Sequence, residues 1–137
     1  MSAEENKAIV RRYQEALNAS NLDALDEVVA QDMRTPDMLP GFPPGLEGAK
    51  RIHQATLAAW PDFHVTIEDL IAEGDRVAAR ITITGTAVNA GFGLPATGRS
   101  FMINGVYVVR IADGKIVEHR GIEDALGLIE QVGKVPS

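Results

Sequence analysis

The chain has 137 residues, no cysteine and a net charge of −6 at neutral pH, with an isoelectric point near 5.0. This length suits a single domain over residues 1–137 that buries a core without metal or disulfide support. The acidic balance argues against nucleic acid and anionic membrane surfaces as partners. The lack of cysteine excludes disulfides, a thiol nucleophile and a thiolate metal site, and it fits a cytoplasmic location.

The first part of the chain has the spacing of helices. Ser2 and Glu5 have the spacing of a capping box, and the apolar residues that follow predict an amphipathic helix over residues 3–18 with Tyr13 on its buried face. A second helix is predicted from about residue 21 to residue 30, and a third over residues 48–60. Between them, residues 31–48 are expected to form a proline-rich loop that serves as a lid or wall of a site.

The second part of the chain has the period of strands. Alternating apolar residues predict strands from residue 63 to 70 and from 77 to 86, then from 100 to 111 and from 115 to 122. A glycine-rich connection over residues 87–98 separates the two pairs, and a short helix over residues 124–132 ends the chain. Helices followed by strands indicate an α+β fold, in which N-terminal helices pack on one face of a curved antiparallel meander and leave a cone-shaped cavity.

Charged residues crowd at the end of the last predicted strand. Asp124 has two readings, as the acid of the cavity or as the N-cap of the final helix. Arg120 shares the strand face of Glu118, Ile122 and Asp124; it either faces the cavity and holds a ligand oxygen, or lies at the rim paired with Glu118. His119 has the opposite parity, so we expect it to face away from the cavity.

Six further residues are candidate ligand contacts. Asn104 is the one amide in the apolar run of residues 101–109. It either lines the cavity and donates a hydrogen bond to a ligand carbonyl, or it bonds across the sheet or faces solvent. Met102 shares its face. The others are apolar or aromatic and read either as core or as cavity wall: Tyr13, Met33, Trp60 and Phe63. The three histidines show no metal-ligand spacing, so we expect no metal and no cofactor.

Five segments carry a resemblance that covers nearly the whole chain: ENKAIVRRYQEALN, NLDALDEVVAQDM, GLPATGRSF, ADGKIVEH and GIEDALGLIEQVG. With them the chain resembles the SnoaL-like polyketide cyclases of the nuclear transport factor 2-like superfamily. The resemblance implies a cone-shaped fold, a homodimer formed through the exposed sheet face, and a pocket aspartate at the position of Asp124 that acts as general acid and base in an intramolecular aldol closure. The chain departs from the family at two places. The family has tryptophan at the position of Arg120, and it commonly has a histidine within the segment that corresponds to residues 33–36.

Three functions follow as hypotheses from the residues and the resemblance. The first is a cofactor-independent cyclase or isomerase that moves a proton on a hydrophobic, polyketide-like carbonyl compound, with Asp124 and Arg120 as catalytic residues. The second is an accessory protein in polyketide hydroxylation. The third is a non-enzymatic protein that binds a small apolar ligand. In each case the expected partners are a small hydrophobic molecule and a second copy of the chain.

Overall fold

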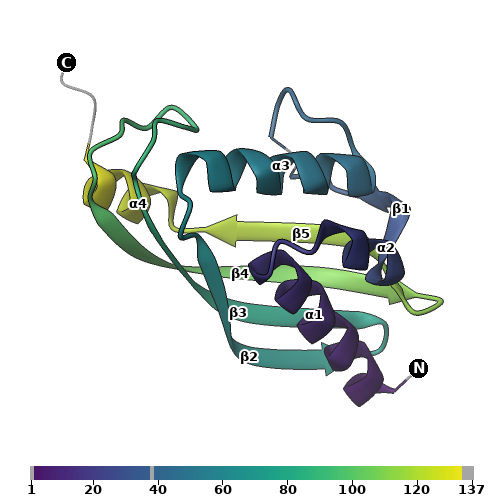
Figure 1. Ribbon diagram of the computed structural model, residues 1–137. Coiled ribbons are helices and arrows are strands. Elements are labelled where there is room, and N and C mark those ends of the chain that lie inside the picture. Colours follow the sequence, from purple (N-terminus) through teal and green to yellow (C-terminus); the bar gives the residue numbers. More distant parts are fainter. Residues whose placement is uncertain (1, 38, 134–137) are drawn as a thin grey trace.

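The structure is a computed structural model that describes residues 2–37 and 39–133. Helices lead into strands, as the α+β prediction requires, and the N-terminal helices pack on a curved sheet (Figure 1). In chain order the elements are α1 (Ala3–Asn18), η1 (Leu22–Ala24), α2 (Leu25–Val28), β1 (Val29–Arg34), α3 (Gly45–Ala59), β2 (His64–Glu73), β3 (Arg76–Thr86), β4 (Ser100–Ala112), β5 (Lys115–Glu123) and α4 (Ala125–Val132).

The sheet contains a strand that the sequence analysis missed. Its order is β1-β5-β4-β3-β2, and β1 pairs in parallel with β5, with Val29 opposite Ile116 and Arg34 opposite Glu118. The prediction of a helix to residue 30 and a loop over residues 31–48 is therefore wrong in two places, because β1 covers residues 29–34 and α3 already begins at Gly45. Strand β1 is stabilised by a partner about 85 residues later, for which its own short segment carries no signal.

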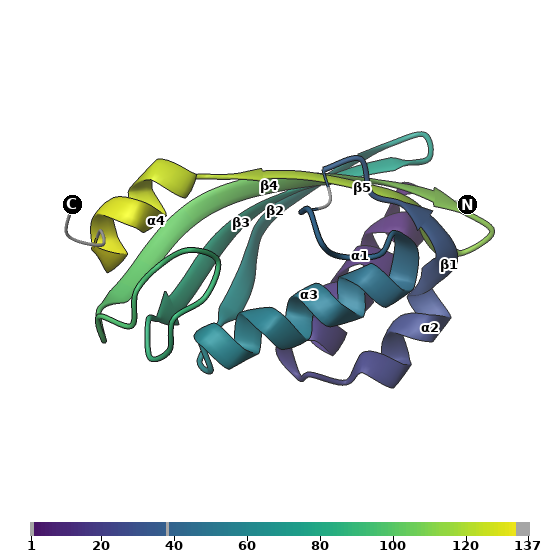
Figure 2. The same cartoon turned by 90° about the horizontal axis from the view of Figure 1, so that it is seen from above.

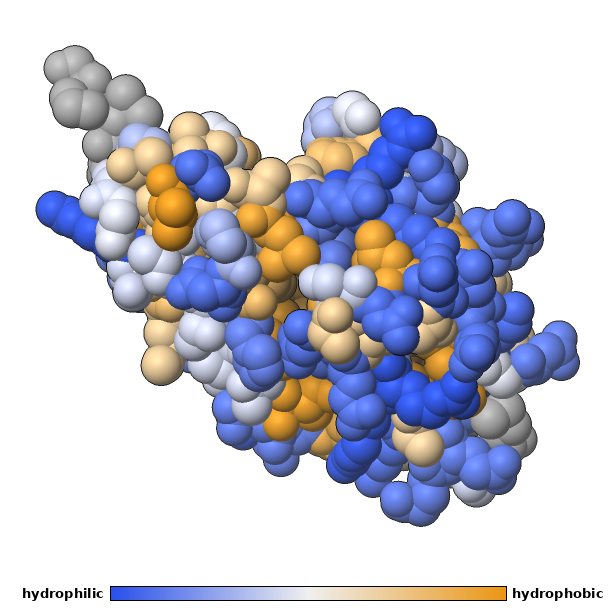
Figure 3. Space-filling view, viewed as in Figure 1, coloured by the Kyte–Doolittle hydropathy of each residue, from blue (hydrophilic) through white to orange (hydrophobic). Residues whose placement is uncertain are grey.

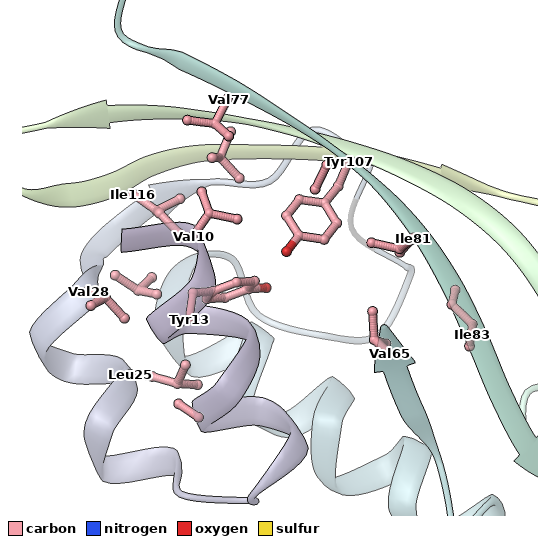
Figure 4. Close-up of a cluster of buried hydrophobic side chains, with 14 of the residues drawn as sticks. Val10, Tyr13, Leu25, Val28, Val65, Val77, Ile81, Ile83, Tyr107 and Ile116 are labelled. Carbon is pink, nitrogen blue, oxygen red and sulfur yellow. The ribbon is translucent and has the colours of Figure 1, made fainter. Parts of the chain in front are cut away.

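Helix α1 forms for local reasons and is held in place by its buried face. The Ser2 hydroxyl accepts a hydrogen bond from the Glu5 amide at 3.1 Å, and the Ser2 amide donates to the Glu5 carboxylate at 3.1 Å, which completes the predicted capping box. Val10 is fully buried and Tyr13 is nearly so. Both face the sheet and join the main hydrophobic cluster (Figure 4).

Two β-bulges curve the sheet and decide which side chains face inward. In β5, Ile116 pairs with Ile111 but Glu118 pairs with Arg110, so Val117 is an extra residue. In β2 the same pattern leaves Glu68 without an opposite residue. A bulge bends its strand and shifts the alternation of side chains by one position. Beyond the bulge in β5, the odd-numbered residues therefore lie on the inner face.

The helices lie on one side of the curved sheet (Figure 2). Helices α1, α2 and α3 cover its concave face, and α4 follows the end of β5 and lies against the first part of β4. There the Gln131 side chain accepts from the Met102 amide at 2.8 Å and donates to the Met102 carbonyl at 2.9 Å, in place of a strand neighbour. Among the described helices, none is both long and apolar enough to cross a membrane.

Replacing Gly45 by alanine should destabilise the fold more than replacing Gly41 by alanine. Both glycines have positive φ, of 77° and 92°, which costs another residue about 1–2 kcal/mol. Only at Gly45 would a new Cβ meet a neighbour, the Gln31 carbonyl oxygen of β1 at 2.6 Å. Urea unfolding should show the larger loss of free energy for Gly45→Ala. Equal losses of unfolding free energy in the two variants would mean that the close packing of α3 on β1 does not contribute to stability.

Candidate active site

A cavity of about 610 Å³ lies between the helices and the inner face of the sheet. This is within the range of pockets that hold drug-sized ligands. Most of the residues that line it are apolar or aromatic, and apolar residues show through a hollow in the middle of the face seen in Figure 3. The polar residues of its wall are Tyr13, Thr35, Asp37, His53, Thr56, Tyr107, His119 and Glu123.

Three rings form the polar end of the cavity. His119 of β5 stacks on Tyr107 of β4, with ring centroids 5.0 Å apart and planes inclined by 24°. Tyr13 of α1 approaches Tyr107 edge-on at 6.0 Å and His119 at 6.0 Å. In Figure 4, Tyr13 and Tyr107 extend toward each other from the helix and the sheet. The group therefore places two phenols and one imidazole in a single cluster.

A chain of amide side chains holds this cluster in position. The Tyr107 hydroxyl donates to the Gln14 side-chain oxygen at 3.2 Å, and the Gln14 amide donates to Asn18 at 3.3 Å. Asn18 pairs with the backbone of Val65 through both its amide and its oxygen, at 2.8 and 3.2 Å. This network ties α1 to β2 and β4, so the Tyr107 hydroxyl is already engaged and its ring is fixed.

Burial keeps these three groups uncharged near neutral pH. It raises the pKa of Tyr13 to about 12 and raises the pKa of Tyr107, to which the nearby Tyr13 adds. Burial lowers the pKa of His119, although the Asp37 charge acts in the opposite direction. A neutral phenol and a neutral imidazole both donate and accept hydrogen bonds. The polar end of the cavity can therefore hold a ligand oxygen without presenting a positive charge.

Asp37 belongs to the cavity although it lies in the segment that follows β1. Its carboxylate accepts a hydrogen bond from the Gly121 amide at 3.2 Å, beyond the point where β1 stops pairing with β5. The pairing of β1 with β5 thus delivers the carboxylate to the cavity wall. Asp37 was not among the predicted site residues, because the strand that carries it there was not foreseen.

Glu123 is the second carboxyl group of the cavity, and it stands at the last residue of β5. A Cβ on its partner Gly105 would meet the Glu123 Cβ at 3.3 Å and the side chain of the buried Ile81 at 3.4 Å, so the Glu123 side chain starts on the inner face. The residue as a whole is nevertheless exposed to solvent. Burial by the surrounding protein raises the pKa of its carboxyl group, which favours proton exchange closer to neutral pH.

Asp124 does not line the cavity. It is exposed and caps α4, where its carboxylate accepts from the Gly127 amide at 2.9 Å. A Cβ at residue 127 would collide with this carboxylate, so Gly127 makes the close cap possible. The placement of Asp124 inside the cavity is therefore wrong, and its alternative reading as the N-cap is the one that the structure shows.

Arg120 also lies outside the cavity wall, and the bulge at Val117 is the reason. Its guanidinium donates to the Glu118 carboxylate at 3.4 Å on the outer side of the sheet, as the rim reading required. The expectation that His119 faces away is wrong for the same reason. Strict alternation from the buried Ile116 would turn Arg120 inward, and the one local sign against it is the adjacent apolar pair Ile116 and Val117.

Of the six remaining candidates, four line the cavity and two do not. Met102 and Asn104 are exposed on the outer face of β4 and do not line the cavity, because β4 pairs with β3 in unbroken register and Gly105 introduces no bulge. The placement of these two residues on the cavity wall is therefore wrong. The other four do line the cavity: Tyr13, Met33, Trp60 and Phe63.

Nothing in the described ranges resembles a metal centre. No group of three or more histidine or acidic side chains is placed to hold an ion within residues 2–37 and 39–133. His53 lines the cavity but pairs with the Ser20 hydroxyl at 3.4 Å, and burial lowers its pKa. Proton transfer and hydrogen bonding are the chemistry that these side chains can supply by themselves.

Comparison with known proteins identifies the family. A profile described as SnoaL-like polyketide cyclase matches residues 7–132. The chain belongs to the SnoaL-like polyketide cyclase family. Among its relatives is the aklanonic acid methyl ester cyclase DauD of Streptomyces sp. (strain C5), which is 32% identical over 132 residues, or 92% of this chain and 80% of that protein.

Solved structures of SnoaL-like proteins have the same architecture. TsrD from Streptomyces laurentii superposes with a TM-score of 0.89 at 28% identity, covering 98% of this chain and 99% of that one. AclR from Streptomyces galilaeus, a candidate hydroxylase, superposes with a TM-score of 0.81 at 28% identity, covering 99% and 89%. The fold expected from the resemblance is thus confirmed, and one of the solved structures that share it is named a candidate hydroxylase.

His119 should give this SnoaL-like protein a pH-dependent stability below pH 6.5. Because burial lowers its folded-state pKa, the unfolded chain binds more protons there, and the free energy of unfolding falls as the pH drops through the unfolded pKa of about 6.5. His119→Gln should flatten this slope in urea unfolding between pH 5 and 7. His53 and Glu123 are present in both the parent protein and the His119→Gln variant, so their contributions to the pH dependence cancel when the two slopes are compared.

His64→Gln is the matched control for this measurement, because His64 is exposed on β2. This variant should keep the slope of the parent protein. A slope that is the same in His119→Gln as in the parent would show that His119 is not held uncharged in the cavity.

Proposed function

We propose that the protein is a cofactor-independent cyclase that closes a ring by intramolecular aldol addition on a neutral, polycyclic, polyketide-like ester. One observation carries the proposal: a single carboxyl group with a raised pKa, that of Glu123, stands in the wall of a largely apolar cavity. The family supports it, since DauD is named a cyclase of a polyketide methyl ester. Glu123, next to the position of the family's aspartate, takes the catalytic role that the resemblance implied for Asp124.

The reaction needs one group that first accepts a proton and later returns it. Ionised Glu123 removes a proton from the carbon next to a substrate carbonyl, and the resulting enolate carbon attacks a second carbonyl of the same molecule. A carbon–carbon bond forms, and the new alkoxide takes the proton back from Glu123. Substrate and product have the same composition, and the enzyme ends in its starting state. A raised pKa makes the carboxylate a stronger base for the first step.

The polar end supplies groups that can hold oxygens of the ligand. The Tyr107 hydroxyl is used by Gln14, which leaves the Tyr13 hydroxyl and the His119 imidazole as donors. His119 and Glu123 lie on the same face of β5 four residues apart, which is about 13 Å along a strand. A ligand that contacts both must therefore be several fused rings long, in keeping with a cavity of about 610 Å³.

The charges around the cavity favour an uncharged substrate. Asp37 and Glu123 both line it, and among the described lining residues there is no lysine or arginine. A free carboxylate would meet two acids without a cationic partner, which is unfavourable. A carboxyl group masked as an ester avoids this repulsion.

Glu123→Gln should lower kcat for ring closure at least about 100-fold, since loss of a general base typically costs 10²–10⁴ in rate. Asp124→Asn is the matched control, because asparagine caps a helix as well as aspartate does. It should leave kcat within about twofold. The assay follows aklanonic acid methyl ester and its cyclised product by chromatography. The opposite ranking of the two variants would return the catalytic role to Asp124.

The hydroxylation hypothesis is supported by one observation, the similarity to the candidate hydroxylase AclR. Mass spectrometry of the same assay separates the two functions. Ring closure leaves the mass of the substrate unchanged, whereas hydroxylation adds one oxygen. A ligand that binds without any change of mass or retention time would instead support the non-enzymatic binding protein.

We also propose that two copies pair through the outer face of the sheet. Large apolar side chains are exposed on three strands of that face, β2, β4 and β5: Ile71, Met102, Val106, Val108 and Ile122. Several exposed apolar side chains on one face are typical of an interaction site. Arg110 and Arg120 flank it, and both approach Glu118, at 3.6 and 3.4 Å.

Val108→Arg should convert the dimer to a monomer in sedimentation equilibrium at micromolar concentration, because it places a further cation in the middle of this surface. The control is Val88→Arg, since Val88 is also exposed but lies on the connection over residues 87–98. A Val108→Arg protein that still sediments as a dimer would exclude this face as the interface.

A further inference from the structure

The end of the cavity opposite His119 is an aromatic cluster centred on Trp60. Trp60 follows the last residue of α3 and is buried. Its ring centroid lies 6.2 Å from that of Phe63, 5.3 Å from that of Phe92 and 5.1 Å from that of Phe101. All four residues line the cavity. Their rings come from α3, from the segment before β2, from the 87–98 connection and from β4.

Phe92 has a backbone conformation that its residue type disfavours. It has φ of 53° and is followed by Gly93 with φ of 77°. Gly91 and Leu94 close this two-residue turn with reciprocal hydrogen bonds of 3.1 and 2.9 Å. Such a turn favours Asn-Gly, and a bulky residue at positive φ is strained. Strain of this kind tends to persist where function requires it.

Burial does not explain the presence of phenylalanine at this position either. Phe92 is 41% exposed, so the ring loses only part of its contact with water when the chain folds. The strained backbone and the exposed ring are both unfavourable in the free protein. A flat ligand lying against Phe92 and Trp60 would cover the exposed part of the ring.

The turn is anchored, so the Phe92 ring has a defined position. The Asn89 amide donates to the Ala59 carbonyl at 3.0 Å, and the Asn89 side chain donates to the Ala58 carbonyl at 2.8 Å. Gly91 packs so closely on Ala59 that a Cβ there would lie 2.5 Å from the Ala59 Cβ. These contacts attach the 87–98 connection to the last turn of α3, directly beside Trp60.

We infer that Trp60, Phe63, Phe92 and Phe101 form a subsite that stacks the planar aromatic rings of the substrate, with Phe92 as the specificity-determining wall. The inference deepens the proposed function and rests on it for the identity of the ligand as a polycyclic ketone. Phe101 and Gly105 lie on the same face of β4, about 13 Å apart along the strand, and Gly105 pairs with Glu123. A ligand with its reacting carbon at Glu123 therefore extends its fused rings toward Trp60.

Stacking predicts a preference for flat rings over saturated ones of similar shape. Offset and edge-on aromatic contacts contribute about 0.5–1.5 kcal/mol beyond the burial of area, or roughly 2- to 12-fold in affinity. A saturated bicyclic ketone gains only from burial. The affinity difference between the two ligand classes should depend on Phe92.

Phe92→Asn tests the subsite with 1,8-dihydroxyanthraquinone as a planar probe. The variant should weaken binding of the probe about fivefold or more in calorimetric titration, and it should raise Tm, because Asn-Gly suits the turn. The matched control is Val88→Asn, at an exposed residue of the same connection that does not line the cavity; it should leave the affinity unchanged. Trp60 is the sole tryptophan of the chain, so its fluorescence should change when the probe binds the parent protein.

A second ligand, trans-1-decalone, separates stacking from simple loss of packing. Its affinity should change less than twofold in Phe92→Asn, since it has no aromatic face. An unchanged affinity for the anthraquinone, an equal loss for both ligands, or binding of the anthraquinone without a change in Trp60 fluorescence would each overturn the inference. These readouts are binding constants, so they hold whether or not Glu123→Gln abolishes ring closure.

Discussion

One extra residue in β5, the bulge at Val117, decides which side chains reach the cavity. Before it, the buried Ile116 sets the inner face; after it, His119, Gly121 and Glu123 take that face, and Arg120 turns outward to Glu118. A regular strand would instead bury Glu118 and Arg120 in an apolar space, where a charged pair recovers its lost hydration only with near-ideal geometry. The bulge thus avoids that cost and places Glu123 on the wall of the cavity.

The cavity has a different character at each end, and the fold builds each end separately. At the polar end, α1 is tied to β2 and β4 by the amides of Gln14 and Asn18, which fix Tyr107 beneath His119. At the aromatic end, the last turn of α3 is tied to the 87–98 connection through Asn89. Glu123 lies between them on β5. A long, flat ligand would therefore be oriented by the two ends, with its reacting carbon placed at the carboxyl group between them.

Local signals in the chain were enough to predict most of the elements. The capping box of α1 depends on residues three apart, and the Asp113-Gly114 turn between β4 and β5 has positive φ at both residues, as that dipeptide predicts. Strand β1 was missed because its partner is β5, near the other end of the chain. The same omission concealed Asp37, which reaches the cavity only because β1 pairs there.

The sequence by itself determined the α+β class and the family, and it selected Tyr13, Met33, Trp60 and Phe63 as residues of the core or the cavity wall, because these results follow from apolar character, local periodicity and similarity along the whole chain. Only the tertiary structure decided which carboxyl group faces the cavity. The resemblance pointed to Asp124, whereas its neighbour Glu123 is the residue on the cavity wall. Alternation along a strand is a local rule that one inserted residue reverses, and where that residue is accommodated is set by pairing with the adjacent strand.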